Sequence, residues 1–492
     1  MLTNCAEPQT SDYKVASNWQ NNHSVSALLP FLWTILCVVI PFWIAPAQKM
    51  EFPSLLLVLS YMVILYAGSR IALVISAGEP VWLPFMFWSF TYIWIGLAMF
   101  AQDLTGNNPY NVTFSPGSQE LACVIALTGM IAFDVGGQLS EYPRARPSRL
   151  PRVVDRRRLI VLFVLTLIGV PLLLRFTGSL EVLFTSRAER SLVAKGIGNT
   201  KAVNAAVASL IMMAPLIASA CFLAIFRTSP KRRRRPGWLV AGGLSILFAL
   251  VATNPISSPR FMSGAIVLGL LFSLGLTQGK KAFRITSSSV FMGLLLLFPY
   301  SDLFRYKGTV LTAHPLIVFL TSKGDYDTAA QMVAVVDYRQ ATGGTNGNQI
   351  LGVIGFFIPR SYWPSKPGAT GDLIVGRIGY PYTNVSSPLW VEAYIDGGFI
   401  GVIIAFIALG YVMTRLSKVF VLNQNALSYS RIMIPLIAAY SLILLRGSLM
   451  TAVAPLTVML AIGWFVTRRE RENRPVGLRG RSTNRDNVGA ET

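Results

Sequence analysis

The residues best suited to chemistry lie in and just after one short, basic segment of the sequence. That segment, "FFIPRSYWPSKPGATGD" (356–372), contains Arg360 and Lys366 among three prolines, two glycines and two aromatic pairs. Arginine and lysine donate charge-assisted hydrogen bonds to carboxylates and phosphates, and each proline fixes one backbone φ angle. The pattern predicts a rigid segment that presents cations and aromatic rings outside the helices.

Two carboxylates follow about 20 residues after this segment. Glu392 and Asp396 in "LWVEAYIDGGFIG" (389–401) are spaced i and i+4, so a helix presents both on one face. A carboxylate there can accept a proton from a hydroxyl group or pair with an arginine. It can also complement the positive end of a helix dipole, and the sequence leaves both interpretations open. The glycines that follow predict close helix packing or a kink.

The chain that positions these residues has the composition of a membrane protein. Of its 492 residues, 53% are hydrophobic and 13% are charged, with a mean hydropathy of +0.53, whereas a soluble domain carries about 25% charged residues. The basic residues behind its formal net charge of +21 lie mostly in short loops between apolar runs, where they set orientation in the membrane. The sequence therefore predicts an integral membrane protein and argues against nucleic-acid binding.

Cysteine and histidine usage predicts no metal site. Cys37, Cys123 and Cys221 lie in apolar runs, where a free cysteine acts as a small hydrophobic residue. The sequence contains no CxxC pair and no cluster of histidine and cysteine, which are the usual signs of a metal or redox site. We expect neither a metal nor a disulfide framework.

Apolar runs predict an all-α polytopic membrane protein with about twelve transmembrane helices. A spanning helix needs roughly 20 residues. The runs are 27–47, 53–77, 81–101, 118–138, 158–175, 203–226, 237–254, 260–277, 286–304, 388–414, 431–447 and 449–467. Only "RGSLM" (446–450) joins the last two, so they are either separate spans or one re-entrant pair.

Basic segments orient these spans. Segment 141–158 carries seven arginines, and segment 227–236 carries five arginines and one lysine. Segments 279–284 and 415–418 and the tail from residue 468 are also basic. With twelve spans, all five fall on one side together with both termini, and that side is predicted to be cytoplasmic.

This orientation divides the chain into five parts: a cytoplasmic N-terminal segment 1–26, spans 1–9 within 27–304, a large extracytoplasmic loop 305–387, spans 10–12 within 388–467, and a basic tail 468–492. We expect the tail to be disordered. A loop as long as 305–387 is either functional or disordered, and its tryptophan, tyrosines and apolar runs argue against disorder. We expect short helices there that lie on or dip into the outer leaflet.

Several basic residues fall on the outer side, against the orientation rule. They include Arg187 in loop 176–202, Arg305, Arg360, Lys366 and Arg377 in the large loop, and Arg260 and Arg446 at the outer ends of two spans. Long loops escape the rule, and an arginine at a span end can extend to the interface, so each has an ordinary interpretation alone. Together they predict a site for an anionic group such as a phosphate or pyrophosphate headgroup. His314 is either a base at this site or an ordinary loop residue.

Two segments resemble the Wzy-type polysaccharide polymerases, the family that joins lipid-linked oligosaccharide repeat units. "IPRSYWPSKPG" (358–368) resembles the Pro-Arg…Trp-Pro…Lys-Pro segment of that family. "SPLWVEAYIDGGFIG" (387–401) resembles its Glu…Tyr…Gly…Gly segment, which opens the next span. The twelve-span plan with a large outer loop late in the chain is also similar. The rest of the sequence matches in architecture alone.

The resemblance implies a glycosyltransferase of the bacterial cytoplasmic (inner) membrane. It would polymerise undecaprenyl-pyrophosphate-linked repeat units into a surface polysaccharide, with neither metal nor cofactor. Arg360 and Lys366 would stabilise the pyrophosphate, and Glu392 would orient or deprotonate the acceptor hydroxyl. Besides Lys366, the substrate-binding residues would be Arg377, Arg305, Arg260, Arg446, Arg187, Tyr362, Trp363, Asp396 and His314. The rings of Tyr362 and Trp363 would stack on sugars or anchor at the membrane interface.

Two other functions stay open. Another lipid-linked glycan transferase or ligase would share the outer basic site but use a different acceptor. A glycolipid flippase or transporter predicts repeat symmetry and charges within several spans, but the sequence shows no repeat and few such charges besides Arg70 and Asp134. The expected partners are the lipid-linked oligosaccharide, membrane lipid and, as an open alternative, a chain-length regulator.

Overall fold

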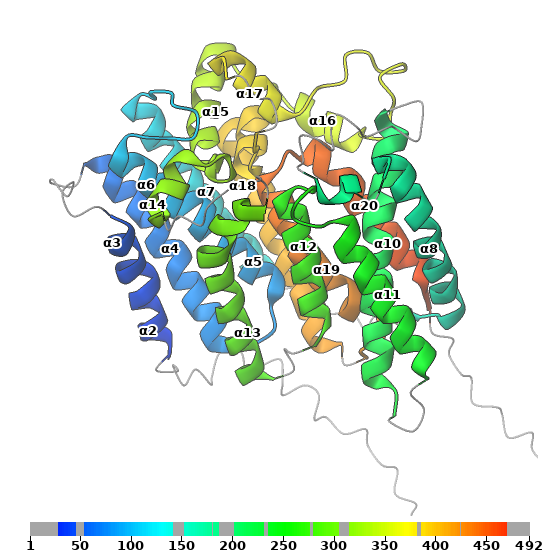
Figure 1. The fold of residues 1–492 in the computed structure, drawn as a ribbon. Helices are drawn as coiled ribbons and strands as arrows, with labels where there is room; N and C mark the ends of the chain where they lie inside the picture. The colour runs from blue at the N-terminus through cyan, green and yellow to red at the C-terminus, as the bar shows by residue number, and fades with distance from the viewer. Residues whose placement is uncertain are drawn as a thin grey trace, which may run out of the picture.

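The structure, a computed structural model, consists almost entirely of helices (Figure 1). It describes residues 28–45, 54–140, 152–179, 181–185, 201–230, 235–275, 279–304, 314–380, 385–423 and 425–469. The predicted N-terminal segment 1–26 and nearly all of the predicted tail 468–492 lie outside the described residues.

Every apolar run of the sequence is helical over most of the residues that the structure describes. Nine helices among the described residues are long and apolar enough to cross a membrane: Leu55–Ala77 (α4), Trp82–Thr105 (α5, η3 and α6), Pro116–Leu139 (α7), Arg156–Thr177 (α8), Lys201–Thr228 (α10), Lys280–Ser301 (α13, η6 and the start of η7), Leu389–Leu422 (α18), Tyr429–Arg446 (α19) and Leu449–Val466 (α20). Three apolar helices are shorter: Leu28–Ile44 (α2, η2 and α3), Pro236–Ala252 (α11) and Arg260–Ser273 (α12). The all-α membrane fold is confirmed, while the count of twelve spans and their orientation stay predictions.

The remaining elements are short. They are the 3₁₀ helices η4 (Glu181–Phe184), η7 (Phe298–Phe304) and η8 (Gly324–Tyr326), the helices α14 (Leu316–Ser322), α15 (Thr328–Thr342), α16 (Asn348–Ile354) and α17 (Thr370–Ile378), and the strands β1 (Arg152–Val154) and β2 (Thr467–Arg469). Three π-helical turns lie within longer helices: η2 (Ile35–Val39), η3 (Thr91–Leu97) and η6 (Gly293–Leu297). The two strands pair antiparallel and tie the start of α8 to the end of α20.

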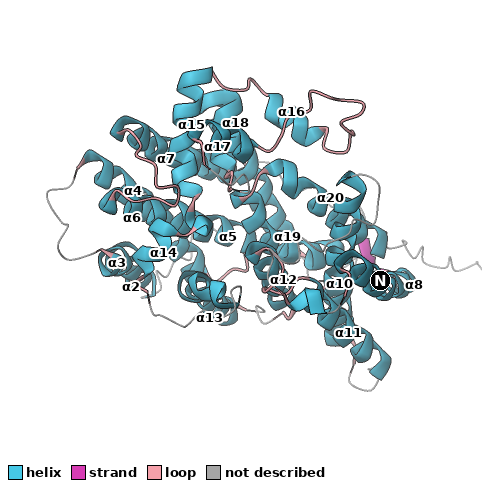
Figure 2. Ribbon diagram, turned by 45° about the horizontal axis from the view of Figure 1, so that its top comes forward, coloured by secondary structure: helices cyan, strands magenta, loops and turns pink. Residues whose placement is uncertain are grey.

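The helices pack into two adjoining hydrophobic clusters. One cluster draws its buried residues mainly from η2, α3–α7, α13–α15, α17 and α18, and the other from α8, α10, α11 and α20. Helices α12 and α19 contribute to both clusters and therefore join them, as their central position in Figures 1 and 2 shows. The last two predicted spans form two helices, α19 and α20, each long and apolar enough to cross a membrane.

Helices α7 and α18 approach closely because glycines face backbone across their contact. A Cβ atom added at Gly136 would overlap the carbonyl of Ile407, and one added at Gly410 would overlap the carbonyl of Phe133. Without a hydrophobic driving force inside a bilayer, such close packing of small residues is a main source of helix association. This contact fixes α18, whose first turn carries Glu392.

Substituting Gly136→Ala is expected to lower the free energy of unfolding by about 1–3 kcal/mol, the usual cost of overpacking. The added methyl group meets a backbone carbonyl of Ile407, which cannot rotate away. Thermal unfolding of the purified protein in detergent measures the effect. Gly264→Ala in α12 is the matched control, because a Cβ atom there meets nothing within 4 Å. Equal unfolding temperatures for the two variants would contradict the proposed packing.

A kink divides α18 at Gly398, as the glycines of this segment predict. Gly398 has φ 58° and ψ −146°, a conformation that glycine adopts at little cost. The kink frees the carbonyls of Tyr394 and Ile395, and Arg339 of α15 donates to both, at 3.1 and 2.9 Å. Arg339 therefore completes the broken turn.

The predicted large loop is ordered where it is described, and part of it lies inside the bundle. Helices α15, α16 and α17 gather at one end, at the top of Figure 1, here termed the upper end; the lower end is where α10 ends and α11 begins. Every residue from Thr328 to Val336 of α15 is buried, and α15 packs against α6, α7, α17 and α18. The small side chains of α15 fit between the bundle helices, and the expectation of short helices that lie on or dip into the outer leaflet stays a prediction.

Candidate functional site

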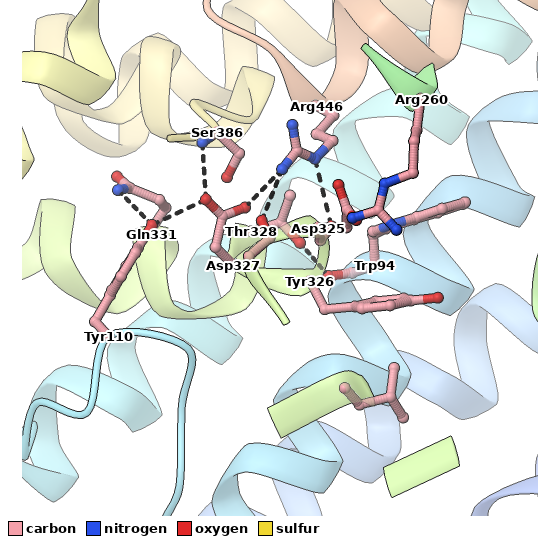
Figure 3. A network of polar contacts seen from close by, with 12 residues as sticks. Trp94, Tyr110, Arg260, Asp325, Tyr326, Asp327, Thr328, Gln331, Ser386 and Arg446 are labelled. Atoms are coloured by element: carbon pink, nitrogen blue, oxygen red, sulfur yellow. Dashed lines mark hydrogen bonds and ion pairs between the residues drawn. The ribbon is translucent and has the colours of Figure 1, made fainter. Parts of the chain in front are cut away.

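A buried polar network lies at the upper end, where residues from distant parts of the chain meet (Figure 3). At its centre are Asp325 and Asp327, which flank the junction between η8 and α15. Arg260 from the start of α12 pairs with Asp325, and Arg446 from the end of α19 pairs with Asp327 at 3.2 Å. Both arginines were predicted site residues, and the structure brings them together.

Both carboxylate oxygens of Asp327 have polar partners. Oδ1 pairs with Arg446, while Oδ2 accepts hydrogen bonds from the Tyr110 hydroxyl at 3.1 Å and from the Ser386 amide at 2.9 Å. Gln331 donates to the Tyr110 oxygen at 2.8 Å. Burial, followed by the charge of Asp327, raises the pKa of Tyr110 well above its usual value, so the hydroxyl stays a donor. The side chain of Asp327 is only 2% exposed, and these partners offset the cost of burying its charge.

Arg446 is the more accessible cation of the network, with 17% of its side chain exposed. Its Nη2 donates to the carbonyl of Gly324 at 2.8 Å, and its guanidinium lies 4.4 Å from the ring of Phe261. Its Nη1 atom makes no hydrogen bond to any residue that the structure describes. Arg446 is thus fixed in position while keeping donors for a ligand.

Arg260 is more deeply placed. Only 7% of its side chain is exposed. In addition to its ion pair with Asp325, Nη1 donates to the Ser301 hydroxyl at 3.3 Å, and the ring of Phe298 lies 6.0 Å away. These contacts tie the start of α12 to η7 and η8 and hold Asp325 beside the network.

Glu392 lies in a second buried polar cluster next to this network. The residue is 5% exposed, and its carboxylate accepts from the Thr370 hydroxyl at 2.5 Å and from the Leu449 amide at 3.1 Å. The hydroxyls of Ser387 and Ser448 also face it. Because Leu449 is the first residue of α20, Glu392 complements the positive N-terminus of that helix. Glu392 therefore contacts the N-terminus of a neighbouring helix rather than that of its own helix, and its predicted catalytic role stays a prediction.

Two short segments connect the two clusters. Ser386 donates to Asp327, while the next residue, Ser387, faces Glu392 and donates its amide to the carbonyl of Arg446 at 2.9 Å. The chain then runs from Arg446 through a two-residue turn to Leu449. Arg446 and Glu392 therefore both contact residues of the same two segments, 385–388 and 446–449. These two segments are here termed the shared wall.

Asp396 has a capping role of its own. It accepts from the amides of Gln349 and Ile350 at 3.1 and 2.8 Å, and from the Thr345 hydroxyl at 2.5 Å. These amides belong to the first turn of α16, whose orphan donors need acceptors. The structure thus places Asp396 at the N-terminus of α16 and Glu392 at the N-terminus of α20.

Arg360 and Lys366 are tied to their own loop. Arg360 donates to the carbonyls of Lys366 and Pro367 at 2.6 and 3.1 Å. Lys366 donates to the carbonyls of Phe356 and Ile358 at 2.7 and 3.0 Å. Partial burial, followed by the charge of Arg360, lowers the pKa of Lys366. These hydrogen bonds restrain the loop in addition to its prolines.

The aromatic residues of this loop differ in environment. Tyr362 is 85% exposed, whereas Trp363 is half-buried and donates to the Ser365 hydroxyl at 3.1 Å. Tyr362 is therefore open to a sugar or to the membrane interface.

Other predicted residues lie apart from the two clusters. Arg377 is exposed at the end of α17, and His314 is exposed before α14, where its carbonyl accepts from the Tyr300 hydroxyl at 3.2 Å. Arg187 and Arg305 lie outside the described residues. No group of three or more His, Cys, Asp or Glu residues able to hold a metal occurs in the described part of the chain.

Two charges within the candidate spans form an ion pair. Arg70 of α4 forms an ion pair with Asp134 of α7, which also accepts from the Tyr66 hydroxyl, and its guanidinium lies 5.7 Å from the ring of Trp88. Arg70 therefore forms an ion pair that links two helices.

Sequence reasoning missed Asp325, Asp327, Tyr110 and Gln331. One signal was available: "GDYDTAAQMVAVV" (324–336) sets two acids just before a run of small and apolar residues, a pattern typical of a helix start. Neither acid is near its arginine in sequence, so their pairing was not predictable.

No protein-family model, curated protein or solved structure matches this chain. The function proposed below rests on the motif resemblance together with the geometry of the upper end.

Proposed function

We propose that this chain is a glycosyltransferase that polymerises undecaprenyl-pyrophosphate-linked oligosaccharide repeat units at the outer face of the bacterial cytoplasmic membrane. The observation that carries the proposal is the shared wall that holds Arg446 and Glu392 at the upper end. A transfer from a lipid pyrophosphate needs a cation for the leaving group and a group that orients the acceptor hydroxyl, and these two residues supply both.

Arg446 is the proposed contact of the leaving pyrophosphate. Its pair with Asp327 and its bonds to η8 hold the guanidinium before substrate arrives. Preorganised donors of this kind stabilise developing charge without reorganisation during the reaction. Asp327 acts as a positioning residue, and Arg260 with Asp325 supports the same structure from α12.

Glu392 is the proposed group for the acceptor. In the reaction the acceptor oxygen bonds to the anomeric carbon, the bond from that carbon to the pyrophosphate oxygen breaks, and the hydroxyl proton passes to a base. Glu392 has the chemistry of such a base. Because it is 5% exposed and contacts Thr370 of α17, the acceptor must enter between α17 and residues 446–449 to reach it.

The loop 356–368 has a supporting role in this proposal. Arg360 and Lys366 donate several hydrogen bonds to carbonyls of their own loop. They therefore stabilise the shape of the loop and bring positive charge near the membrane surface. Exposed Tyr362 then offers a ring to a sugar of the glycan.

Deleting the gene in its host and complementing with the intact chain tests the function. We expect the deletion to leave lipid-linked single repeat units and the complemented strain to restore long glycan chains on a gel. Long chains made but left on the lipid carrier in the deletion would indicate a ligase. Repeat units trapped on the cytoplasmic side would indicate a flippase, and either result would overturn the proposal.

A further inference from the structure

A cavity lies at the lower end, away from the site described above. It has a volume of about 40 Å³, more than the roughly 10–15 Å³ that one ordered water needs. The end of α10, the end of α12, the last turns of α18 and the first turns of α19 line it. Its polar lining includes Arg227 of α10, Arg431 of α19 and Ser273 of α12.

Both arginines are held in place by backbone carbonyls. Arg227 donates from Nη1 to the Ser273 carbonyl at 3.1 Å. Arg431 donates from Nη1 to the Phe420 carbonyl at 3.3 Å, and its guanidinium lies 4.3 Å from the ring of Phe420. A guanidinium has five N–H donors, so each arginine keeps donors for a further acceptor.

Gly275 leaves space for the guanidinium of Arg227. A Cβ atom at Gly275, just after α12, would overlap the guanidinium of Arg227. Gly275 also has φ 66°, which favours glycine. The close approach of this backbone fixes the direction in which Arg227 enters the cavity.

The parts of these helices that line the cavity carry no carboxylate to balance the two charges. The sequence contains no Asp or Glu in residues 201–301 or 397–469, and these ranges supply every lining residue. The two guanidinium groups lie close enough to repel each other. Two like charges in a half-buried cavity are costly unless an anion binds between them.

We propose that Arg227 and Arg431 bind a phosphate group in this cavity. Paired guanidinium groups suit a phosphate because their planar donors match its oxygens. The group belongs either to the headgroup of an anionic lipid or to a soluble phosphate. This site is independent of the glycosyltransferase proposed above, since it lies at the opposite end of the bundle.

Binding of two probes to the full-length, delipidated chain in detergent tests the site. The probes are a short-chain phosphatidylglycerol, measured by native mass spectrometry, and inorganic phosphate added as a competitor. We expect the double variant Arg227→Gln/Arg431→Gln to bind the lipid at least tenfold more weakly. Arg284→Gln is the matched control, because Arg284 also donates to a backbone carbonyl at the lower end, that of Ser76, but does not line the cavity.

The competition separates the two sources of phosphate. Displacement of the lipid by inorganic phosphate supports a site open to soluble phosphate, whereas arginine-dependent lipid binding without displacement supports a lipid headgroup. Equal lipid binding by the double variant and the intact chain, or no binding of either probe, would overturn the proposal.

A second variant keeps the test decisive if the double variant does not fold. Gly275→Ala retains both charges but displaces the Arg227 guanidinium. We expect this single methyl group to weaken lipid binding severalfold, with the Arg284→Gln control unchanged. Binding at the level of the intact chain would overturn the proposal that Arg227 contacts the phosphate.

Discussion

Arg446→Ala is expected to abolish long glycan chains and to lower the free energy of unfolding by about 3–5 kcal/mol, the usual cost of removing one partner of a buried ion pair. The cause is Asp327, whose side chain is 2% exposed and whose Oδ1 atom would lose its cation. Glycan gels of complemented deletion strains measure the activity, and thermal unfolding in detergent measures the stability.

A second substitution separates these two effects. The double variant Arg446→Ala/Asp327→Asn removes the uncompensated charge, while the amide oxygen of the new side chain can still accept from Tyr110 or Ser386, the partners of Asp327. We expect it to recover much of the lost stability but to make no long chains. Long chains from this double variant would show that Arg446 is needed for folding alone and would remove it from the proposed site.

Glu392→Gln is expected to slow polymerisation by about 10²–10⁴-fold, the usual contribution of a general base, with a change of less than about 1 kcal/mol in the free energy of unfolding. The amide has the same shape, so its oxygen can still accept from the Leu449 amide while its nitrogen faces the Thr370 hydroxyl. The length distribution of the glycans measures the first effect, and unfolding temperature measures the second.

The matched control is Glu79→Gln, the same exchange in the loop between α4 and α5, far from the upper end. We expect this variant to make glycans of normal length. If Glu392→Gln also makes normal glycans, Glu392 is a cap of α20 and the acceptor is oriented by another group.

Much of the fold was predictable because apolar runs act locally. A helix satisfies all its backbone hydrogen bonds within one segment, so a long apolar run in lipid must be helical whatever its neighbours are. Each of the predicted runs is helical over most of its described residues, and the kink at Gly398 follows from a glycine pair. The buried position of α15 was not predictable, because its small residues give no strong hydropathy signal.

The candidate site was predictable only in part. Arg446 and Arg260 stood out because an arginine at a span end is costly in the membrane, and Glu392 stood out through its spacing and motif. Their partners did not, because Arg446 and Asp327 are 119 residues apart in sequence. Arg360 and Lys366 looked free for a ligand, yet each binds carbonyls of its own loop.

The sequence by itself determined the membrane class, the positions of the helices and the side chains able to bind an anion. Those properties follow from hydropathy and residue type, which are read one segment at a time. Only the tertiary structure decided which charges neutralise one another, which carboxylate caps which helix, and that Arg446 and Glu392 share one wall. Such pairings depend on the packing of α15, α18 and α19, because a polar side chain binds whatever partner the folded chain places beside it.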